Sequence, residues 1–265
     1  MVTNRAVNGG RILVLAGGGR LSKVVCHALF REFESSAEVR VVVEDPPSKI
    51  HILRRRLKRL GALTVLGQVL FSVLAVPVLS RIHRARIEDI QRTYEFDRSA
   101  FGSEVIYVSS VNDCEVANIL HEFDPDVVVV FGTRIIGKKI LRHVRCPILN
   151  THMGITPAYR GVHGGYWALA DRRPDLVGAT VHRVDEGIDT GDVVEQVYIN
   201  VTDQDSFVTY PYLQLAAGLP ALFRAIWEAL GGTLKSLSPP EVESSLKYHP
   251  TLWKYVHTWI QHGVK

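Results

Sequence analysis

The chain has few cysteines, and their positions suggest neither a disulfide framework nor a zinc site. Only Cys26, Cys114 and Cys146 occur in 265 residues, an odd number without the short spacings of metal ligands. We therefore expect a reducing, cytoplasmic location and no bound metal. The first eleven residues lack an apolar segment ahead of the first expected strand, so a cleaved signal peptide is not expected.

Acidic residues are scarce in one segment of the chain, and this segment accounts for the net positive charge of the whole protein. Nine Lys or Arg lie between His51 and Arg92 against only Glu88 and Asp89, so this segment carries +7 and the remainder carries −3 of the total +4. The segment has few aromatic residues on which bases could stack. A nucleic-acid partner is therefore not expected.

The order of apolar runs and helical patterns predicts an α/β fold. Strands are expected at residues 11–16, 39–43, 104–108, 126–131 and 148–150, with helices between them, such as 21–33 and 113–123. This alternation predicts a Rossmann-like domain with a mostly parallel central sheet and flanking helices. We place that domain at residues 1–205, with a helical insertion at 47–95, and expect a C-terminal helix and tail, 206–265, to pack on it.

The insertion contains twenty uncharged residues, 61–80, which are long enough to span a bilayer and are flanked by basic clusters. A true span would put the earlier and later strands of one sheet on opposite sides of the membrane. Two interpretations remain open. The helices pack on the domain or across a homodimer, which we favour, or residues 51–92 make peripheral contact with an anionic membrane surface.

A glycine turn follows the first expected strand. Gly17, Gly18 and Gly19 lack the third glycine of the dinucleotide-binding fingerprint, so a strand-to-helix turn that needs small residues is the favoured interpretation. Backbone amides of Gly17 and Gly18, with the helix N-terminus, could still hold a phosphate of an acceptor substrate.

Three polar residues at the ends of apolar runs suggest acyl transfer to an amine. Asn150 and His152 end one run, and Asp189 lies in the loop after a second run. An amide and an imidazolium can donate hydrogen bonds to a tetrahedral oxyanion. Asp189 can sustain the charge on His152 and take the proton that the amine loses, directly or through a water.

The blocks that carry these residues resemble the folate-dependent formyltransferases, which include glycinamide ribonucleotide, methionyl-tRNA and amino-sugar formyltransferases. The matching blocks follow the family order with near-family spacing. They are residues 130–136, 147–152, 157–161, 178–182 and 185–191.

The resemblance implies a formyl donor, 10-formyltetrahydrofolate, and a role for each matching residue. The implied catalytic residues are Asn150, His152 and Asp189. The implied donor-binding residues are Arg134, Ile135 and Ile136, with Asp185, Glu186, Gly187 and Ile188 as the wall of the pterin pocket. Residues expected at the acceptor are Gly17, Gly18, Arg160, Gly161 and His163, and both His163 and His182 are also weighed as packing histidines.

We expect the acceptor to be a small-molecule primary amine, on an amino sugar attached to a nucleotide or lipid carrier. Initiator tRNA is not expected, because methionyl-tRNA formyltransferases add a β-rich domain that exceeds what the tail can hold. Three alternatives remain: a purine-pathway enzyme similar to glycinamide ribonucleotide formyltransferase, a formyltetrahydrofolate hydrolase, and a catalytically silent membrane-associated scaffold. The hydrolases carry an N-terminal regulatory domain that is not evident here, and the three polar residues speak against the scaffold.

Overall fold

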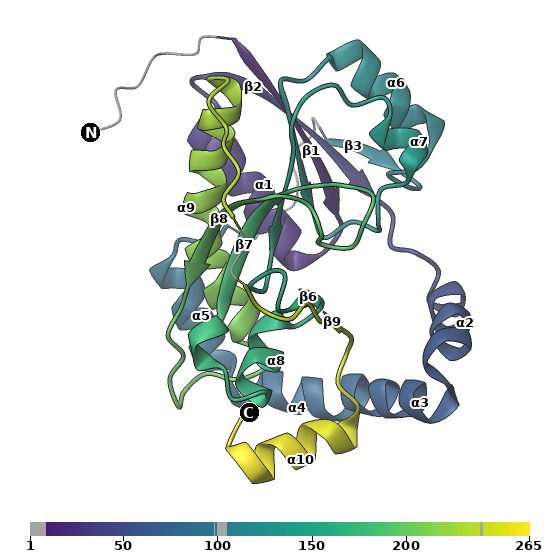
Figure 1. The fold of residues 1–265 in the computed structure, drawn as a ribbon, viewed down its shortest axis with the longest axis vertical. Coiled ribbons are helices and arrows are strands. Elements are labelled where there is room, and N and C mark those ends of the chain that lie inside the picture. Colours follow the sequence, from purple (N-terminus) through teal and green to yellow (C-terminus); the bar gives the residue numbers. More distant parts are fainter. Residues whose placement is uncertain (1–8, 98, 100–104, 239–240) are drawn as a thin grey trace.

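A seven-stranded sheet forms the centre of the computed structural model, which describes residues 9–97, 99, 105–238 and 241–265 (Figure 1). The strand order is β3-β2-β1-β4-β5-β7-β8, and a separate two-stranded sheet pairs β6 with β9. The strands are β1 (Gly10–Gly17), β2 (Ala37–Glu44), β3 (Val105–Val108), β4 (Val127–Phe131), β5 (Ile148–His152), β6 (Arg160–Gly161), β7 (Gly178–Arg183), β8 (Val193–Tyr198) and β9 (Leu246–Lys247).

The first five strands of the central sheet are parallel; β7 runs antiparallel to β5, and β8 runs antiparallel to β7. The predicted α/β fold with a mostly parallel sheet is therefore confirmed. β4 is buried along its whole length, as its apolar sequence predicts for a strand covered on both faces. The strand expected at 104–108 is observed from Val105, and residue 104 lies outside the described residues.

Helices cover both faces of the sheet. Ile12, Val14 and Ala16 point to one face, where α1 (Arg20–Phe33) and α9 (Tyr210–Leu230) pack. The alternate residues Leu13 and Leu15 point to the other face, under α6 (Cys114–Phe123) and α7 (Lys138–Leu141). Two short elements, α8 (Gly164–Ala170) and the 3₁₀ turn η2 (Pro174–Leu176), follow β6.

The insertion between β2 and β3 is helical, as expected. It comprises α2 (Lys49–Leu60), α3 (Ala62–Leu70), a π-helical turn η1 (Phe71–Ala75), α4 (Val76–Ile82) and α5 (Arg84–Thr93). The last helix of the chain, α10 (Leu252–His262), packs beside α3 and η1 (Figure 1). Contact is close, since a Cβ added to Gly67 would lie 2.3 Å from the ring of Trp253.

One helical stretch of the described residues, Ala62–Ile82, is apolar and long enough to cross a membrane. The sheet argues against a crossing, because the strands on either side of the insertion are direct neighbours and Val41 pairs with Val105. Only 22% of its most apolar window is buried inside the molecule. Packing on the domain therefore accounts for one side of this stretch and leaves the other side uncovered.

Gly17 marks a point where β1 and the end of β4 approach too closely for any side chain. A Cβ at Gly17 would lie 2.2 Å from the carbonyl oxygen of Gly132, whereas a Cβ at Gly18 meets nothing within 4 Å. We expect Gly17→Ala to lower the free energy of unfolding by roughly 1–3 kcal/mol, the usual cost of overpacking. Gly18→Ala is the matched control in urea denaturation, and equal stability of the two variants would contradict this account.

Candidate functional site

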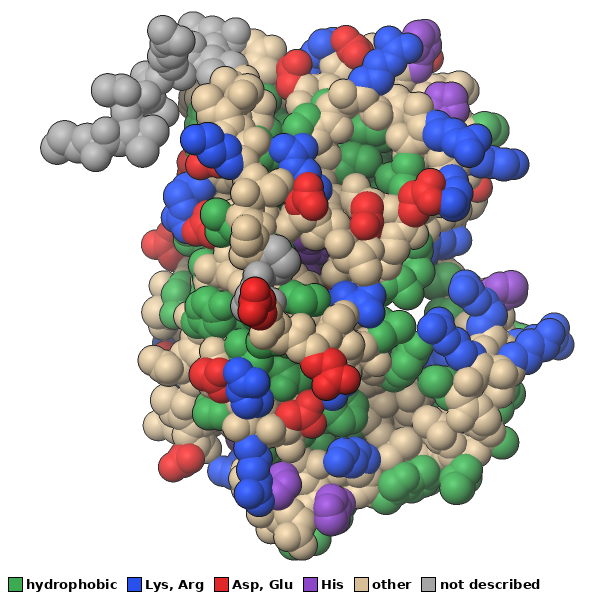
Figure 2. Space-filling view, viewed as in Figure 1, with side chains coloured by type: hydrophobic (Ala, Val, Ile, Leu, Met, Phe, Trp, Pro, Cys, Tyr) green, Lys and Arg blue, Asp and Glu red, His purple; other side chains and the backbone are tan. Residues whose placement is uncertain are grey.

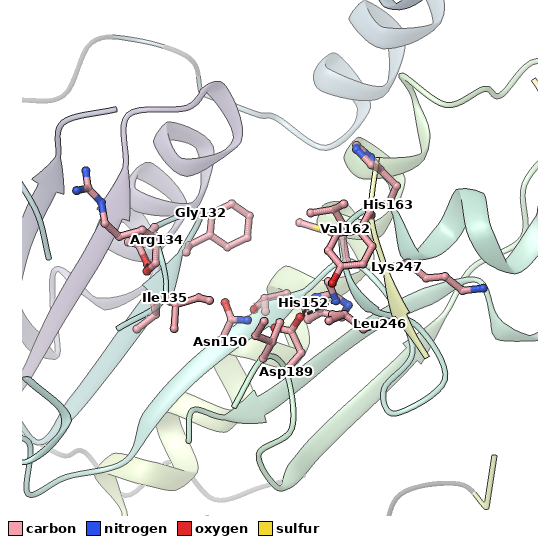
Figure 3. A pocket seen from close by; sticks show the side chains of 18 of the residues that line it. Gly132, Arg134, Ile135, Asn150, His152, Val162, His163, Asp189, Leu246 and Lys247 are labelled. Carbon is pink, nitrogen blue, oxygen red and sulfur yellow. Dashed lines mark hydrogen bonds and ion pairs between the residues drawn. The ribbon is translucent and has the colours of Figure 1, made fainter. Parts of the chain in front are cut away.

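A cavity of about 740 Å³ opens at the carboxyl ends of β4 and β5 (Figure 3). The strand order reverses direction here, because β1 is followed in sequence by β2 on one side and pairs with β4 on the other. Open parallel sheets bind their ligands at such a point. The fold itself therefore places a binding site where the polar strand ends converge.

The polar residues meet because of strand register. Asn150 and His152 are two residues apart on β5 and so point to the same side of the sheet. Asn150 lies opposite His182 on β7, and its Nδ2 donates a hydrogen bond to Nε2 of His182 over 3.0 Å. Asp189 reaches both histidines: its Oδ2 lies 3.4 Å from Nδ1 of His152, and its Oδ1 lies 3.6 Å from Nε2 of His182.

The loop that carries Asp189 is held from the neighbouring turn. The backbone N–H of Gly161 donates to Oδ2 of Asp189 over 2.9 Å, and the guanidinium of Arg160 donates to the carbonyl of Ile188 over 3.1 Å. Gly161 has φ +92°, and a Cβ there would lie 2.3 Å from the carbonyl oxygen of Lys247. Arg160 and Gly161 therefore position the loop that carries Asp189.

Burial sets the proton balance of the site. Desolvation lowers the pKa of the His152 imidazole, and the nearby Asp189 carboxylate only partly opposes this effect. Burial also acts to raise the pKa of Asp189, but its contacts with His182, His152 and the Gly161 amide together lower it to about 2. The carboxylate is therefore ionised, beside an imidazole that burial keeps neutral.

The hydrogen bonds of His152 show where an added proton would go. Its Nε2 lies 2.7 Å from the carbonyl oxygen of Tyr159, which can only accept, so Nε2 carries a hydrogen. The other nitrogen, Nδ1, faces Asp189. Protonation at Nδ1 would complete an ion pair with the carboxylate, so this arrangement can accept a proton from a reacting amine.

The loop after β4 forms another wall of the cavity, and a buried glutamate holds it. Glu44, only 3% exposed, pairs with the guanidinium of Arg134 over 2.7 Å. That guanidinium also donates to the carbonyls of Asp45 and Ser109, and Figure 3 shows it pointing away from Asn150 and His152. Arg134 therefore offers the cavity its backbone and stem, next to the apolar side chain of Ile135.

Most residues singled out from the sequence lie together in this cavity. Those that line it are Arg134, Ile135, Ile136, Asn150, His152, Gly161, His163, Asp185, Gly187, Ile188 and Asp189. The structure does not bring Gly17, Gly18, Arg160 and Glu186 into the lining. Gly17 abuts Gly132, Arg160 holds the loop that carries Asp189, and Glu186 pairs with Lys138.

Two walls of the cavity come from segments that sequence reasoning did not connect with the site. The insertion contributes Arg56, Leu60 and Gln68, and the tail contributes the run from Leu246 to His249. Neither segment carries a motif, and only the folded chain brings them to β5. The amide of Gln68 joins them, since its Nε2 donates to the carbonyl of His249 over 2.9 Å.

A histidine pair stands at this end of the cavity. Nε2 of His163 lies 2.9 Å from Nδ1 of His249. Burial and the neighbouring positive charge of Arg56 lower the pKa of His163 to about 3 and that of His249 to about 4, with a further contribution to His163 from His249. Both rings are therefore neutral near pH 7, and Arg56 supplies the positive charge at this wall. Among the described residues, no group of three or more His, Cys, Asp or Glu could hold a metal ion.

The chain belongs to the formyl transferase family, because that family's model matches residues 10–212. The sequence resemblance is thereby confirmed.

Relatives within the family act on different acceptors. The chain is 32% identical to a methionyl-tRNA formyltransferase of Anaeromyxobacter dehalogenans over 56% of this chain and 47% of the relative. It is 43% identical to a phosphoribosylglycinamide formyltransferase of Mycobacterium tuberculosis over 34% of this chain and 40% of the relative. A GDP-perosamine N-formyltransferase of Brucella melitensis is 28% identical over 51% of this chain and 48% of the relative. The chain thus spans about half the length of the curated relatives it matches.

Known structures show the same fold. A sugar N-formyltransferase from Shewanella sp. superposes with a TM-score of 0.55 at 12% identity, covering 90% of this chain and 76% of the other. At this identity the likeness supports the fold and leaves the acceptor undecided.

The low pKa of Asp189 makes a prediction about stability in acid. The folded state lowers this pKa from 3.8 to about 2, so the carboxylate stabilises the fold at higher pH and loses that contribution as the pH falls from about 5 to 2. We expect Asp189→Asn to remove roughly 2 kcal/mol of this pH dependence. Urea denaturation between pH 2 and 7 measures it, with the exposed Asp203→Asn as control. Identical slopes for Asp189→Asn and the unmodified protein would contradict the assignment.

Proposed function

We propose that this protein transfers a formyl group from 10-formyltetrahydrofolate to a primary amine, on an amino sugar that is joined to a phosphate-bearing carrier. The observation that carries the proposal is the convergence of Asn150, His152 and Asp189 at the strand ends beside the cavity. Family membership supports the reaction, and the charge of the cavity walls supports the acceptor.

The arrangement suits attack of an amine on a formyl group. Asn150 can donate its amide N–H to the oxyanion that forms at the formyl carbon. His152 is neutral before the reaction and can take the proton of the attacking nitrogen at Nδ1, where Asp189 stabilises the resulting imidazolium. The transfer breaks the bond between the formyl carbon and the donor nitrogen, and the proton that His152 received passes to that nitrogen as tetrahydrofolate leaves.

The two ends of the cavity differ in a way that suits two substrates. The end formed by Ile135, Ile136 and Ile188 is apolar, and we place the flat pterin of the donor there. The opposite end has Arg56 beside the neutral pair of His163 and His249, and none of the lining residues there is acidic. A phosphate on the acceptor would find a positive charge and hydrogen-bonding groups at that end.

The amino sugar is favoured over glycinamide ribonucleotide by the walls that the insertion and tail add around Arg56. A carrier with two phosphates and a base or lipid fills a larger site than a ribonucleotide monophosphate. Glycinamide ribonucleotide remains the second candidate, because the Mycobacterium tuberculosis relative is 43% identical over its matched 90 residues.

Single substitutions of Asn150, His152 and Asp189 test the proposed reaction. We expect Asn150→Ala to lower kcat by about 10²-fold to 10³-fold, the cost of losing one oxyanion donor. His152→Ala and Asp189→Asn are each expected to lower it by about 10²-fold to 10⁴-fold through loss of proton transfer. Release of tetrahydrofolate is followed by absorbance, with His121→Ala on α6 as the control. Full turnover by Asp189→Asn would exclude the proposed proton path.

A comparison of candidate amines as substrates identifies the acceptor. Nucleotide-linked 4-amino sugars with uridine, thymidine and guanosine carriers are compared with glycinamide ribonucleotide at equal concentration, and products are identified by mass spectrometry. The proposal expects formylation of at least one amino sugar at a kcat/KM well above that for glycinamide ribonucleotide. Preferential formylation of glycinamide ribonucleotide would instead establish the second candidate.

Arg56 is expected to bind the phosphate of the acceptor. Arg56→Ala should raise the acceptor KM about tenfold, through loss of a charge-assisted hydrogen bond, and should leave kcat nearly unchanged. Arg55→Ala is the matched control, since Arg55 is the exposed neighbour on α2 and does not line the cavity. Equal KM values for the two variants would remove Arg56 from the acceptor site.

A further inference from the structure

Exposed apolar side chains concentrate at one end of the molecule. Of twenty exposed large hydrophobic residues in the described part of the chain, fourteen lie on the insertion helices and α10. We call the part on the long helical stretch and α10 the apolar face. It consists of Leu63, Leu66, Val69, Val73, Leu74, Val78 and Ile82, with Trp253, Val256, Trp259 and Ile260. Three more, Ile50, Leu53 and Leu57, form a stripe on α2.

The helices cannot turn this face inward, because their other side is already buried. Val65 and Gln68 are 3% and 2% exposed, and Phe71 is fully buried against the rings of Phe207 and Tyr255, at centroid distances of 4.8 and 4.9 Å. Tyr255 belongs to α10, so the same cluster fixes that helix as well. The apolar face is therefore the outward side of these helices in the described structure.

The surroundings of the face are basic. Residues 46–87 contain nine Lys or Arg and no Asp or Glu, and α10 contains Lys254 and no acidic residue. Arg54, Arg55, Lys58 and Arg59 are exposed on α2. Figure 2 shows blue side chains gathered over α2, with green side chains along the adjoining edge below α3. The apolar face thus combines aliphatic residues with two exposed tryptophans, and basic residues lie next to it.

We propose that the apolar face docks on the surface of an anionic lipid bilayer, parallel to its plane and without crossing it. Helices that lie in the interface carry this combination of Leu, Trp and Lys or Arg, and anionic headgroups attract the basic residues. The sheet excludes a crossing, as the pairing of β2 with β3 shows. A large exposed apolar surface on a soluble chain marks an interaction site.

Charge favours a bilayer over a second copy of the chain. A two-fold symmetric dimer places the same patch of each subunit against the other. Such a contact would bring the exposed cations of α2 and Arg81 in one copy close to those of its partner, and none of the residues that form the apolar face is acidic. An anionic bilayer offers the opposite charge.

The apolar face and its basic surroundings lie on the same helices that line part of the cavity. Arg56 and Leu60 on α2 and Gln68 on α3 line the cavity, while neighbouring residues on the same helices form the basic rim and the apolar face. Docking would therefore hold the acceptor end of the cavity near the lipid surface. The docking proposal does not rest on the formyl transfer reaction and is tested without any substrate.

Vesicle flotation of the full chain tests the proposal. We expect binding to phosphatidylcholine vesicles that contain 30% phosphatidylglycerol, weaker binding at high salt, and little binding to pure phosphatidylcholine. Leu63→Asp with Val73→Asp, both on the exposed side, should lower partitioning at least tenfold. Tyr107→Asp with Tyr198→Asp adds the same charge at exposed positions on β3 and β8 and should bind like the unmodified protein.

A second measurement keeps the proposal testable if the aspartate variants unfold. Lipids brominated in their acyl chains should quench the tryptophan fluorescence of the unmodified protein, and Trp253→Phe with Trp259→Phe should remove most of that quenching. Absence of flotation on anionic vesicles at low salt would overturn the proposal, as would equal flotation of the two aspartate pairs. A dimer that Leu63→Asp with Val73→Asp dissociates, in a protein that does not float, would assign the face to a second copy.

Discussion

The site depends on one buried carboxylate. Asp189 takes a hydrogen bond from Gly161 and lies within 3.6 Å of the imidazoles of His152 and His182. A carboxylate without such partners would be costly at this depth, so the loop, the turn after Tyr159 and both strands must hold their relative positions. The antiparallel course of β7 matters for the same reason, since it puts His182 opposite Asn150. Electrostatic satisfaction of a single side chain thus couples four segments of the chain.

The end of the cavity around Arg56 is built differently, from the helical insertion and the C-terminal tail. Arg56 and Gln68 come from the insertion after β2, and His249 comes from the tail before α10. The hydrogen bond from Gln68 to the His249 carbonyl ties these additions together. Asn150, His152 and Asp189 lie outside the insertion, although the tail reaches Asp189 through the pairing of β9 with Arg160 and Gly161. This separation is consistent with the different acceptors named for the relatives.

Much of this arrangement could be predicted from the sequence, and the limits have physical causes. The buried run of β4 predicts a parallel strand, and the polar residues at the end of β5 predict two of the three polar site residues, because period and position are local properties. The roles of Gly17 and Arg160 could not be separated from ligand binding, since a close backbone approach and a loop contact leave the same residue types in the sequence. Contacts of Arg56 and His249 with the cavity are long-range, and no periodicity reports them.

The long apolar stretch shows why composition alone leaves the environment of a helix open. Residues apolar all round are expected for a helix buried in protein, for a membrane span and for a helix shared between protein and lipid. The folded chain separates these cases, because Val65 and Phe71 are buried in protein while Leu63 and Val73 are 71% and 63% exposed. The neighbouring strands β2 and β3 exclude a span. This helical stretch has one side packed on protein and the other side uncovered, and the exposed basic residues of α2 lie close to it. Such an arrangement suits the boundary between a protein and an anionic surface.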